Sequence, residues 1–221
     1  MNIRKFILSL TLLFGMLSVN AQDWRGFLEI YAGTSPTTSD LKFQDDTFYD
    51  MWNSLSFGLN YTMGVAVIPQ LYAGIGIGGY TTFIAYHDDP IYNYWDSTFS
   101  WLNFPIFANI RWIPDINKKI NPFVDLKIGY QIGVDLDENR LWTESYDKNV
   151  KYYVQRRNGL FLQPGVGIRF GRDSAFNLGI AYSVCVPQEF VAKDRTQQSM
   201  PVVESIKKNF GSFMLTFGVD F

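Results

Sequence analysis

The sequence predicts an all-β fold, an eight-stranded antiparallel up-and-down transmembrane β-barrel. Three observations carry this prediction. Apolar and polar residues alternate in eight segments, short and long connectors alternate between these segments, and each segment has one bulky apolar face and one small polar face. Alternation with a period of two places successive side chains on opposite sides of a strand. The chain of 221 residues has the length of one such domain.

The first four segments each have one apolar face. Segment 24–34 sets leucine, isoleucine and alanine against glutamate and tyrosine. Segment 53–63 alternates large apolar residues with Ser, Gly, Asn and Thr, and is the clearest of all. Segment 71–83 alternates Leu, Ala and Ile with a column of Tyr and Gly, and segment 99–113 alternates apolar residues with Asn, Phe and Arg. Each is therefore predicted to be a strand.

The last four segments repeat the scheme. Segment 122–134 sets Val, Leu, Ile and Tyr against Asp, Lys, Gln and Gly, and segment 159–170 sets Leu, Val, Ile and Phe against Gln, Gly and Arg. Segment 175–186 sets apolar residues against Asn, Gly and Ser, with the single cysteine, Cys185, as a small wall residue. Segment 213–221 alternates strictly and ends on an aromatic residue. Each segment is about as long as a tilted strand that crosses a bilayer.

The connectors between these segments alternate in length. Short connectors are predicted at 64–70, 114–121 and 171–174, and long ones at 35–52, 84–98, 135–158 and 187–208. Tight periplasmic turns and long surface loops give a membrane barrel this alternation, whereas a soluble barrel has no reason to gather its long loops at one end. An even strand count then predicts that both termini lie in the periplasm.

The small polar columns are predicted to face the lumen, because an eight-stranded barrel has little interior space. The bulky columns then face lipid. The inward columns carry three acidic and three basic residues, namely Glu29, Arg111, Asp125, Lys127, Arg169 and Asp220. Isolated charges in a narrow lumen are costly, so these groups are expected to pair across the barrel and plug it. A selectivity ring in a narrow channel for ions or very small solutes is the alternative.

Segments 102–111, 121–130 and 165–169, together with the terminal Phe221, resemble the small outer-membrane β-barrel family of Bacteroidota-type bacteria. The resemblance implies an OmpA/OmpX-like barrel without a periplasmic domain, in contact with outer-membrane lipid and lipopolysaccharide. It also implies that the barrel assembly machinery reads the last strand as an assembly signal. The residues of that signal are Phe213, Leu215, Phe217, Val219 and Phe221. The family carries no catalytic residues over to this chain.

The amino-terminal residues 1–21 read as a secretory signal peptide. Arg4 and Lys5 precede an apolar run, and small side chains end at Ala21, a plausible cleavage point. The run is too short to cross a bilayer as a helix. The barrel domain is therefore expected to cover residues 22–221, with a retained amino-terminal anchor as the alternative.

Few residues in the sequence suggest a catalytic or ligand-binding role. The formal net charge of −2 argues against a nucleic-acid partner. The glycine-rich stretch 74–79 lacks the following helix that a dinucleotide site needs, so its glycines are expected to admit side chains into the lumen. His87, with Ser97 or Ser100, could serve a lipid A-modifying enzyme, but a solvated loop histidine is the expectation. No catalytic residue, cofactor or metal is therefore expected.

The predicted surface loops differ in charge. The first three are acidic and aromatic, which suits a surface ligand such as a glycan, Ca²⁺ or a partner protein, although packing of these side chains on one another is favoured. The fourth carries Lys193, Arg195, Lys207 and Lys208 and suits anionic lipid headgroups. The sequence thus predicts a non-enzymatic outer-membrane barrel with a plugged lumen that contributes to envelope integrity or surface binding.

Overall fold

The structure is a computed structural model. It describes residues 24–35, 41–42, 47–50, 54–87, 97–134, 150–155, 158–172, 174–184, 188–194, 196–199, 201–208 and 211–221. The predicted signal peptide, residues 1–21, lies outside the described residues. Within the described ranges, no helix is long and apolar enough to cross a membrane.

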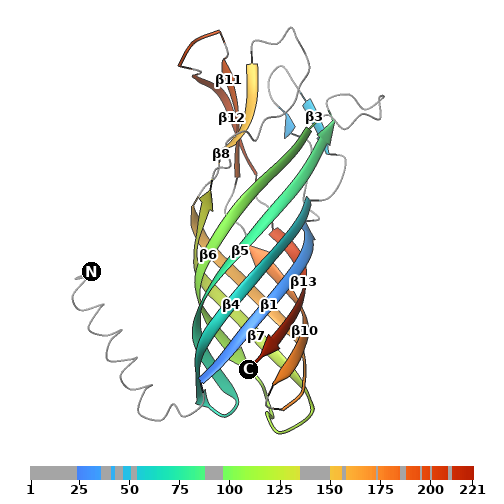
Figure 1. The fold of residues 1–221 in the computed structure, drawn as a ribbon. Helices are drawn as coiled ribbons and strands as arrows, with labels where there is room; N and C mark the ends of the chain where they lie inside the picture. Colours follow the sequence, from blue (N-terminus) through green and yellow to red (C-terminus); the bar gives the residue numbers. More distant parts are fainter. Residues whose placement is uncertain are drawn as a thin grey trace, which may run out of the picture.

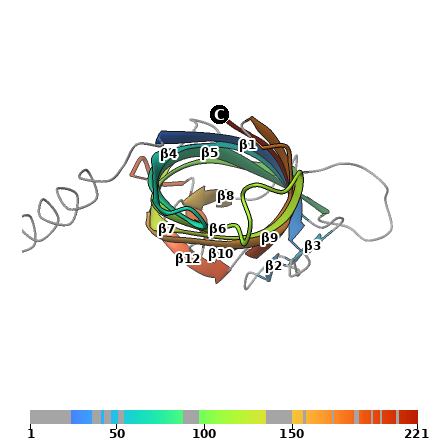
Figure 2. The same ribbon diagram turned by 90° about the horizontal axis from the view of Figure 1, so that it is seen from below.

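Eight strands of the described chain form a closed antiparallel barrel (Figure 1). They are β1 (Trp24–Ser35), β4 (Ser54–Ile68), β5 (Leu71–His87), β6 (Ser97–Trp112), β7 (Ile120–Val134), β9 (Gly159–Phe170), β10 (Ala175–Val184) and β13 (Gly211–Asp220). Each pairs with the barrel strand before and after it in the chain, and β1 pairs with β13. This last pairing removes any free edge, so the strands appear as a ring when viewed along the barrel (Figure 2). The predicted fold class is confirmed.

The side chains of the barrel strands point as the alternation predicts, with the bulky apolar columns outward and the small polar columns into the lumen. Large apolar side chains on the outer wall are exposed, for example those of Ile75 and Ile77 on β5, which are 62% and 60% exposed. The polar residues that alternate with such columns are buried in the lumen, among them Asn60, Asn103 and Gln131. A soluble barrel would show the reverse. The outer wall is therefore suited to lipid, and the closed sheet leaves no barrel strand with an unpaired edge toward it.

The predicted turn at 64–70 is wrong in its extent. Strand β4 continues to Ile68, and only Pro69 and Gln70 form the turn to β5. Val67 and Ile68 are exposed on the wall, and the β4–β5 ladder shifts register between Ala66 and Ile68. These apolar residues favour a strand that ends with an irregularity, and proline stops it because it has no N–H to donate.

The predicted long connectors are also more regular than expected. They contain β2 (Leu41–Lys42), β3 (Thr47–Asp50), β8 (Val150–Gln155), β11 (Gln188–Asp194) and β12 (Val202–Lys208). Strands β12, β11 and β8 pair in that order into a second sheet, which stands beyond the barrel in Figure 1. The predicted long surface loops thus contain strands that pair within one connector, β2 with β3 and β11 with β12, and strands that pair with distant segments, β3 with β5 and β8 with β11.

Glycines on the inner wall make room for aromatic rings. A side chain at Gly76 would collide with the ring of Phe107, and one at Gly74 with the hydroxyl of Tyr72. A side chain at Gly167 would meet the ring of Phe123. Large aromatic residues therefore fit inside a narrow barrel, which agrees with the expected role of the glycine-rich stretch 74–79.

Candidate functional site: the charged lumen

Four of the six charged residues predicted to face the lumen form one compact cluster, the lumen tetrad. It consists of Glu29 on β1, Arg111 on β6, and Asp125 and Lys127 on β7. All four side chains are between 1% and 5% exposed. Asp125 and Lys127 share one face of β7 because they are two residues apart, and Arg111 is the register partner of Asp125.

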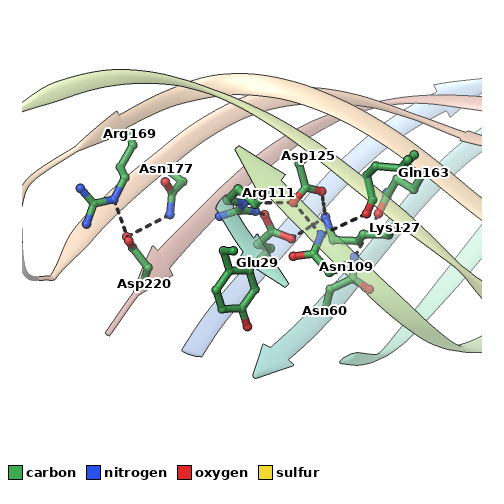
Figure 3. A network of polar contacts seen from close by, with 12 residues as sticks. Glu29, Asn60, Asn109, Arg111, Asp125, Lys127, Gln163, Arg169, Asn177 and Asp220 are labelled. Atoms are coloured by element: carbon green, nitrogen blue, oxygen red, sulfur yellow. Dashed lines mark hydrogen bonds and ion pairs between the residues drawn. The ribbon is translucent and has the colours of Figure 1, made fainter. Parts of the chain in front are cut away.

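Each acid of the lumen tetrad contacts both bases (Figure 3). The Arg111 Nη2 pairs with Glu29 Oε1, and the Arg111 Nε lies 3.0 Å from Asp125 Oδ2. The Lys127 Nζ lies 2.9 Å from Glu29 Oε2 and 2.5 Å from Asp125 Oδ1. Asn109 donates a further hydrogen bond of 2.8 Å from Nδ2 to Asp125 Oδ2. Two positive and two negative groups thus balance, as buried charges require.

The lumen tetrad spans the full width of the barrel. In the closed strand order, β1 and β7 are four strands apart in either direction, so they are opposite walls of an eight-stranded ring. Glu29 on one wall nevertheless reaches Lys127 on the other in a direct ion pair. At this level, side chains from opposing walls are in contact across the lumen.

Aromatic rings hold the guanidinium of Arg111 on two sides. Its central carbon lies 4.3 Å from the ring centroid of Phe27 and 4.6 Å from that of Phe123. Phe27 in turn packs edge-on against Tyr72 at 4.6 Å between centroids. Such cation–π contacts stabilise a cation that has left water. Apolar rings therefore border the tetrad inside the lumen.

The other two predicted charges, Arg169 and Asp220, form a separate pair. The Arg169 Nε lies 2.7 Å from Asp220 Oδ2, and Asn177 donates to the second oxygen of Asp220 at 3.3 Å. Arg169 also donates to the backbone carbonyls of Gly171 and Arg172 at 2.9 and 2.6 Å. Figure 3 shows this pair apart from the tetrad. Arg169 therefore connects the turn between β9 and β10 with Asp220 at the end of the lumen.

Uncharged side chains cross the lumen on the loop side of the tetrad. Asn60 on β4 donates to Gln163 on β9 at 3.2 Å, and these two strands are also opposite walls. Tyr80 donates to Gln131 at 2.6 Å. A buried cluster surrounds these contacts, composed of Tyr31, Tyr80, Phe107, Phe161, Ala181 and Met214. The lumen is thus crossed by side chains at more than one level.

Sequence reasoning missed these uncharged partners. Asn60, Asn109 and Gln131 lie in the inward columns that the alternation defines, so the pattern marks them as lumen residues. It gives no reason to prefer them over other inward residues, because their partners come from distant strands.

The residues of the enzyme alternative lie on two neighbouring strands. His87 is the last residue of β5 and not a loop residue, and Ser97 and Ser100 lie in β6, where Ser97 pairs with Tyr86 and Ser100 with Phe83. No cluster of three potential metal ligands occurs among the residues that the structure describes.

The predicted assembly signal lies on the outer wall of β13 and at the carboxyl terminus. Phe213, Leu215 and Phe217 alternate with buried or half-buried residues and are exposed, as is Phe221. The backbone of Phe221 exchanges two hydrogen bonds with Gly26, of 2.8 and 3.0 Å. The ring of Phe221 lies where a side chain at Gly26 would be. The last residue is therefore joined to the first barrel strand.

Comparison with known proteins gives matches to structures only. No protein-family model and no curated protein sequence matches the chain. The structure is similar to the outer membrane protein OprG from Pseudomonas aeruginosa, with 13% identity, a TM-score of 0.58, and coverage of 91% of this chain and 97% of that chain. The fold is that of an outer-membrane β-barrel. The likeness extends at lower TM-scores to AlkL in lipid bilayers (15% identity, 0.48, 91% and 90% covered) and Neisserial surface protein A (12%, 0.44, 89% and 94%).

Proposed function

We propose that this protein is a non-enzymatic outer-membrane barrel whose lumen is plugged by the tetrad and whose second sheet of β8, β11 and β12, the loop sheet, serves surface contacts or envelope integrity. The observation that carries the proposal is the ion pair between Glu29 and Lys127, which joins opposite walls. A solute on its way through the lumen would have to separate buried, mutually paired charges. Such separation costs several kcal/mol because each charge would lose its partner without regaining water.

The placement in the membrane forms part of the proposal. Its support is the apolar outer wall, the barrel fold and the export signal expected in residues 1–21. The tight turns would face the periplasm together with both termini, and the loop sheet would face the outside. The assembly machinery would recognise β13 and Phe221, so Phe221→Ala is expected to lower the amount of folded barrel in the membrane, whereas Phe176→Ala, on the outer wall near the same end, should not.

The test of the plug is single-channel conductance of the refolded, heat-modifiable protein in a planar bilayer. Wild-type protein should be silent while the gel shift proves that it is folded. Arg111→Ala combined with Arg169→Ala removes one cation from each charged group and should produce a current that the wild-type protein lacks. Lys118→Ala combined with Lys119→Ala, in the exposed turn between β6 and β7, is the matched control and should leave the bilayer silent. Reproducible steps from wild-type protein that change with the lumen substitutions would refute the plug.

A narrow channel for ions or very small solutes is the second candidate. Its support is a set of buried polar atoms that have no hydrogen-bond partner among the described residues, including Asn60 Oδ1, Thr62 Oγ1 and Asn109 Oδ1. Buried polar atoms of this kind usually bind water. The same conductance experiment distinguishes the two functions, since a water-filled path would conduct in the wild-type protein.

A further inference from the structure

At the tight-turn end of the barrel, inward side chains are buried where an open mouth would expose them. Asp220 is the last residue of β13 and Arg169 the penultimate residue of β9, yet their side chains are 2% and 1% exposed. Asn121, the second residue of β7, and Ala175, the first residue of β10, are also buried. The lumen is therefore covered at this end.

The connector between β6 and β7, residues 113–119, lies over this opening, and we call it the turn cap. It is at the lower end of the barrel in Figure 1, and in the view along the barrel its yellow-green trace runs across part of the ring (Figure 2). At its start, the N–H of the buried Ile113 donates to the carbonyl of Gln70 in the β4–β5 turn at 2.8 Å. At its end, the carbonyl of Lys119 accepts from the N–H of Gly171 in the β9–β10 turn, also at 2.8 Å. The turn cap is thus bonded to a neighbouring turn on each side.

Arg169 fixes the second of these attachments. Its Nη1 and Nη2 donate to the carbonyls of Gly171 and Arg172 at 2.9 and 2.6 Å, while its Nε pairs with Asp220. The N–H of the same Gly171 binds the turn cap. A guanidinium spreads its donors over three nitrogens in a rigid plane, so one side chain binds two carbonyls and a carboxylate at once. Arg169 therefore sets the position of the turn that the cap is bonded to.

The turn cap and the lumen tetrad are separate. Among the residues that the structure describes, no ion pair joins Arg169 or Asp220 to a member of the tetrad. Figure 3 shows the Arg169–Asp220 pair to one side of the tetrad. A solute that enters from the tight-turn end would thus meet the turn cap before the tetrad.

We infer that the lumen is closed twice in series, by the lumen tetrad and by the turn cap, and that Arg169 is the residue that positions the cap. Loss of the tetrad alone leaves the cap over the mouth, and release of the cap alone leaves the tetrad. The inference rests on the plugged barrel proposed above and adds to it a second barrier at the tight-turn end.

The test measures the reactivity of a thiol beneath the turn cap in the refolded full-length protein. Cys185→Ser removes the one native cysteine, and Ala175→Cys introduces a thiol at the covered mouth. A charged, water-soluble methanethiosulfonate should modify this thiol at least a hundredfold more slowly than that of Asn117→Cys, at an exposed position of the cap itself. Adding Arg169→Ala should raise the rate in the Ala175→Cys protein at least tenfold.

Two further variants distinguish positioning of the cap from simple charge balance. Arg169→Lys keeps a cation for Asp220, but all its donors are on one nitrogen, so it cannot reproduce the bonds to both turn carbonyls and should raise the rate at least fivefold. Arg111→Ala disturbs the tetrad instead and should change the rate by less than twofold. The heat-dependent gel shift verifies folding of every variant. An unchanged rate in Arg169→Ala, or a wild-type rate in Arg169→Lys, would overturn the inference.

Conductance in a planar bilayer tests the series arrangement. Arg111→Ala alone should be silent because the turn cap remains, whereas Arg111→Ala combined with Arg169→Ala should conduct. A current from Arg111→Ala equal to that of the double variant would show that there is no second barrier and would overturn the inference. A current from Arg169→Ala alone would instead refute the tetrad as a plug, while the thiol rates would still support the cap, so the two failures are distinguishable.

Discussion

The substitution Glu29→Ala is expected to destabilise the barrel strongly, because it unbalances the lumen tetrad. Glu29 contacts Arg111 and Lys127, and the variant leaves these two cations with Asp125 as the one remaining acid of the tetrad. Two unit charges about 4 Å apart interact with about 4 kcal/mol at an effective dielectric constant of about 20. Two such attractions are lost, while the repulsion between Glu29 and Asp125 and the cost of burying the Glu29 carboxylate disappear.

The net loss is expected to be about 3–5 kcal/mol, which is typical when one partner of a buried ion pair is removed. Urea unfolding of the refolded protein in lipid vesicles, followed by tryptophan fluorescence, measures this free energy. Glu29→Ala combined with Lys127→Ala restores the charge balance, since Arg111 and Asp125 remain paired at 3.0 Å. The double variant should therefore be more stable than Glu29→Ala alone, with a coupling energy of about 1–3 kcal/mol.

The exposed pair of Lys118 and Asp115 supplies the control. Its nitrogen and oxygen are 3.6 Å apart, and the side chains are 70% and 40% exposed. Lys118→Ala should change the free energy of unfolding by less than about 0.5 kcal/mol. A loss below about 1 kcal/mol for Glu29→Ala, or a double variant no more stable than the single one, would refute the reasoning, because the tetrad would then be screened by water.

Three further substitutions test separate parts of the structure. Tyr80→Phe leaves the buried Gln131 oxygen without its 2.6 Å donor and should cost about 1–2 kcal/mol in the same unfolding assay. Gly171→Ala should cost about 1–3 kcal/mol, since Gly171 has φ of +127° and a side chain there would lie 2.6 Å from the carbonyl of Ser174; Ser174→Ala in the same turn should be nearly neutral. Hydrogen bonds from the hydroxyl and backbone N–H of Thr196 lower the pKa of Asp194, so its contribution is present at neutral pH and is lost as the pH falls below the ordinary range of an aspartate. The protection factor of the Thr196 amide, its exchange rate relative to the intrinsic rate at the same pH, should then fall in acid, and Asp194→Asn should remove this pH dependence.

Much of the barrel follows from the sequence because a strand repeats every two residues. Segment 53–63, for example, separates its apolar and polar residues cleanly, and the burial of β4 follows that pattern. The turn predicted over 64–70 is too long because the end of β4 at Ile68 is marked by the missing N–H of Pro69 and not by a change in polarity. Strand β8 could not be recognised locally, since its pairing partner β11 lies in a different connector.

For the charged residues too, the sequence predicts one part of the arrangement and only the structure shows the rest. The inward positions of Glu29 and Lys127 follow from their columns, but their contact does not, because the chain separates them by nearly a hundred residues. The sequence groups Arg169 and Asp220 with the other four inward charges, whereas the structure shows them as a separate pair whose arginine also bonds the backbone of the β9–β10 turn.

By itself, the sequence determined the number of barrel strands, the face that each presents to lipid, and the set of residues that point inward. These properties are local, since they depend on the two-residue period and on residue size. Only the tertiary structure decided which inward side chains meet, because strands in a closed barrel are staggered, and the stagger fixes which residues of opposite walls lie at the same height. The contact of Glu29 with Lys127 across the barrel is therefore a property of closure and register, which no single segment encodes.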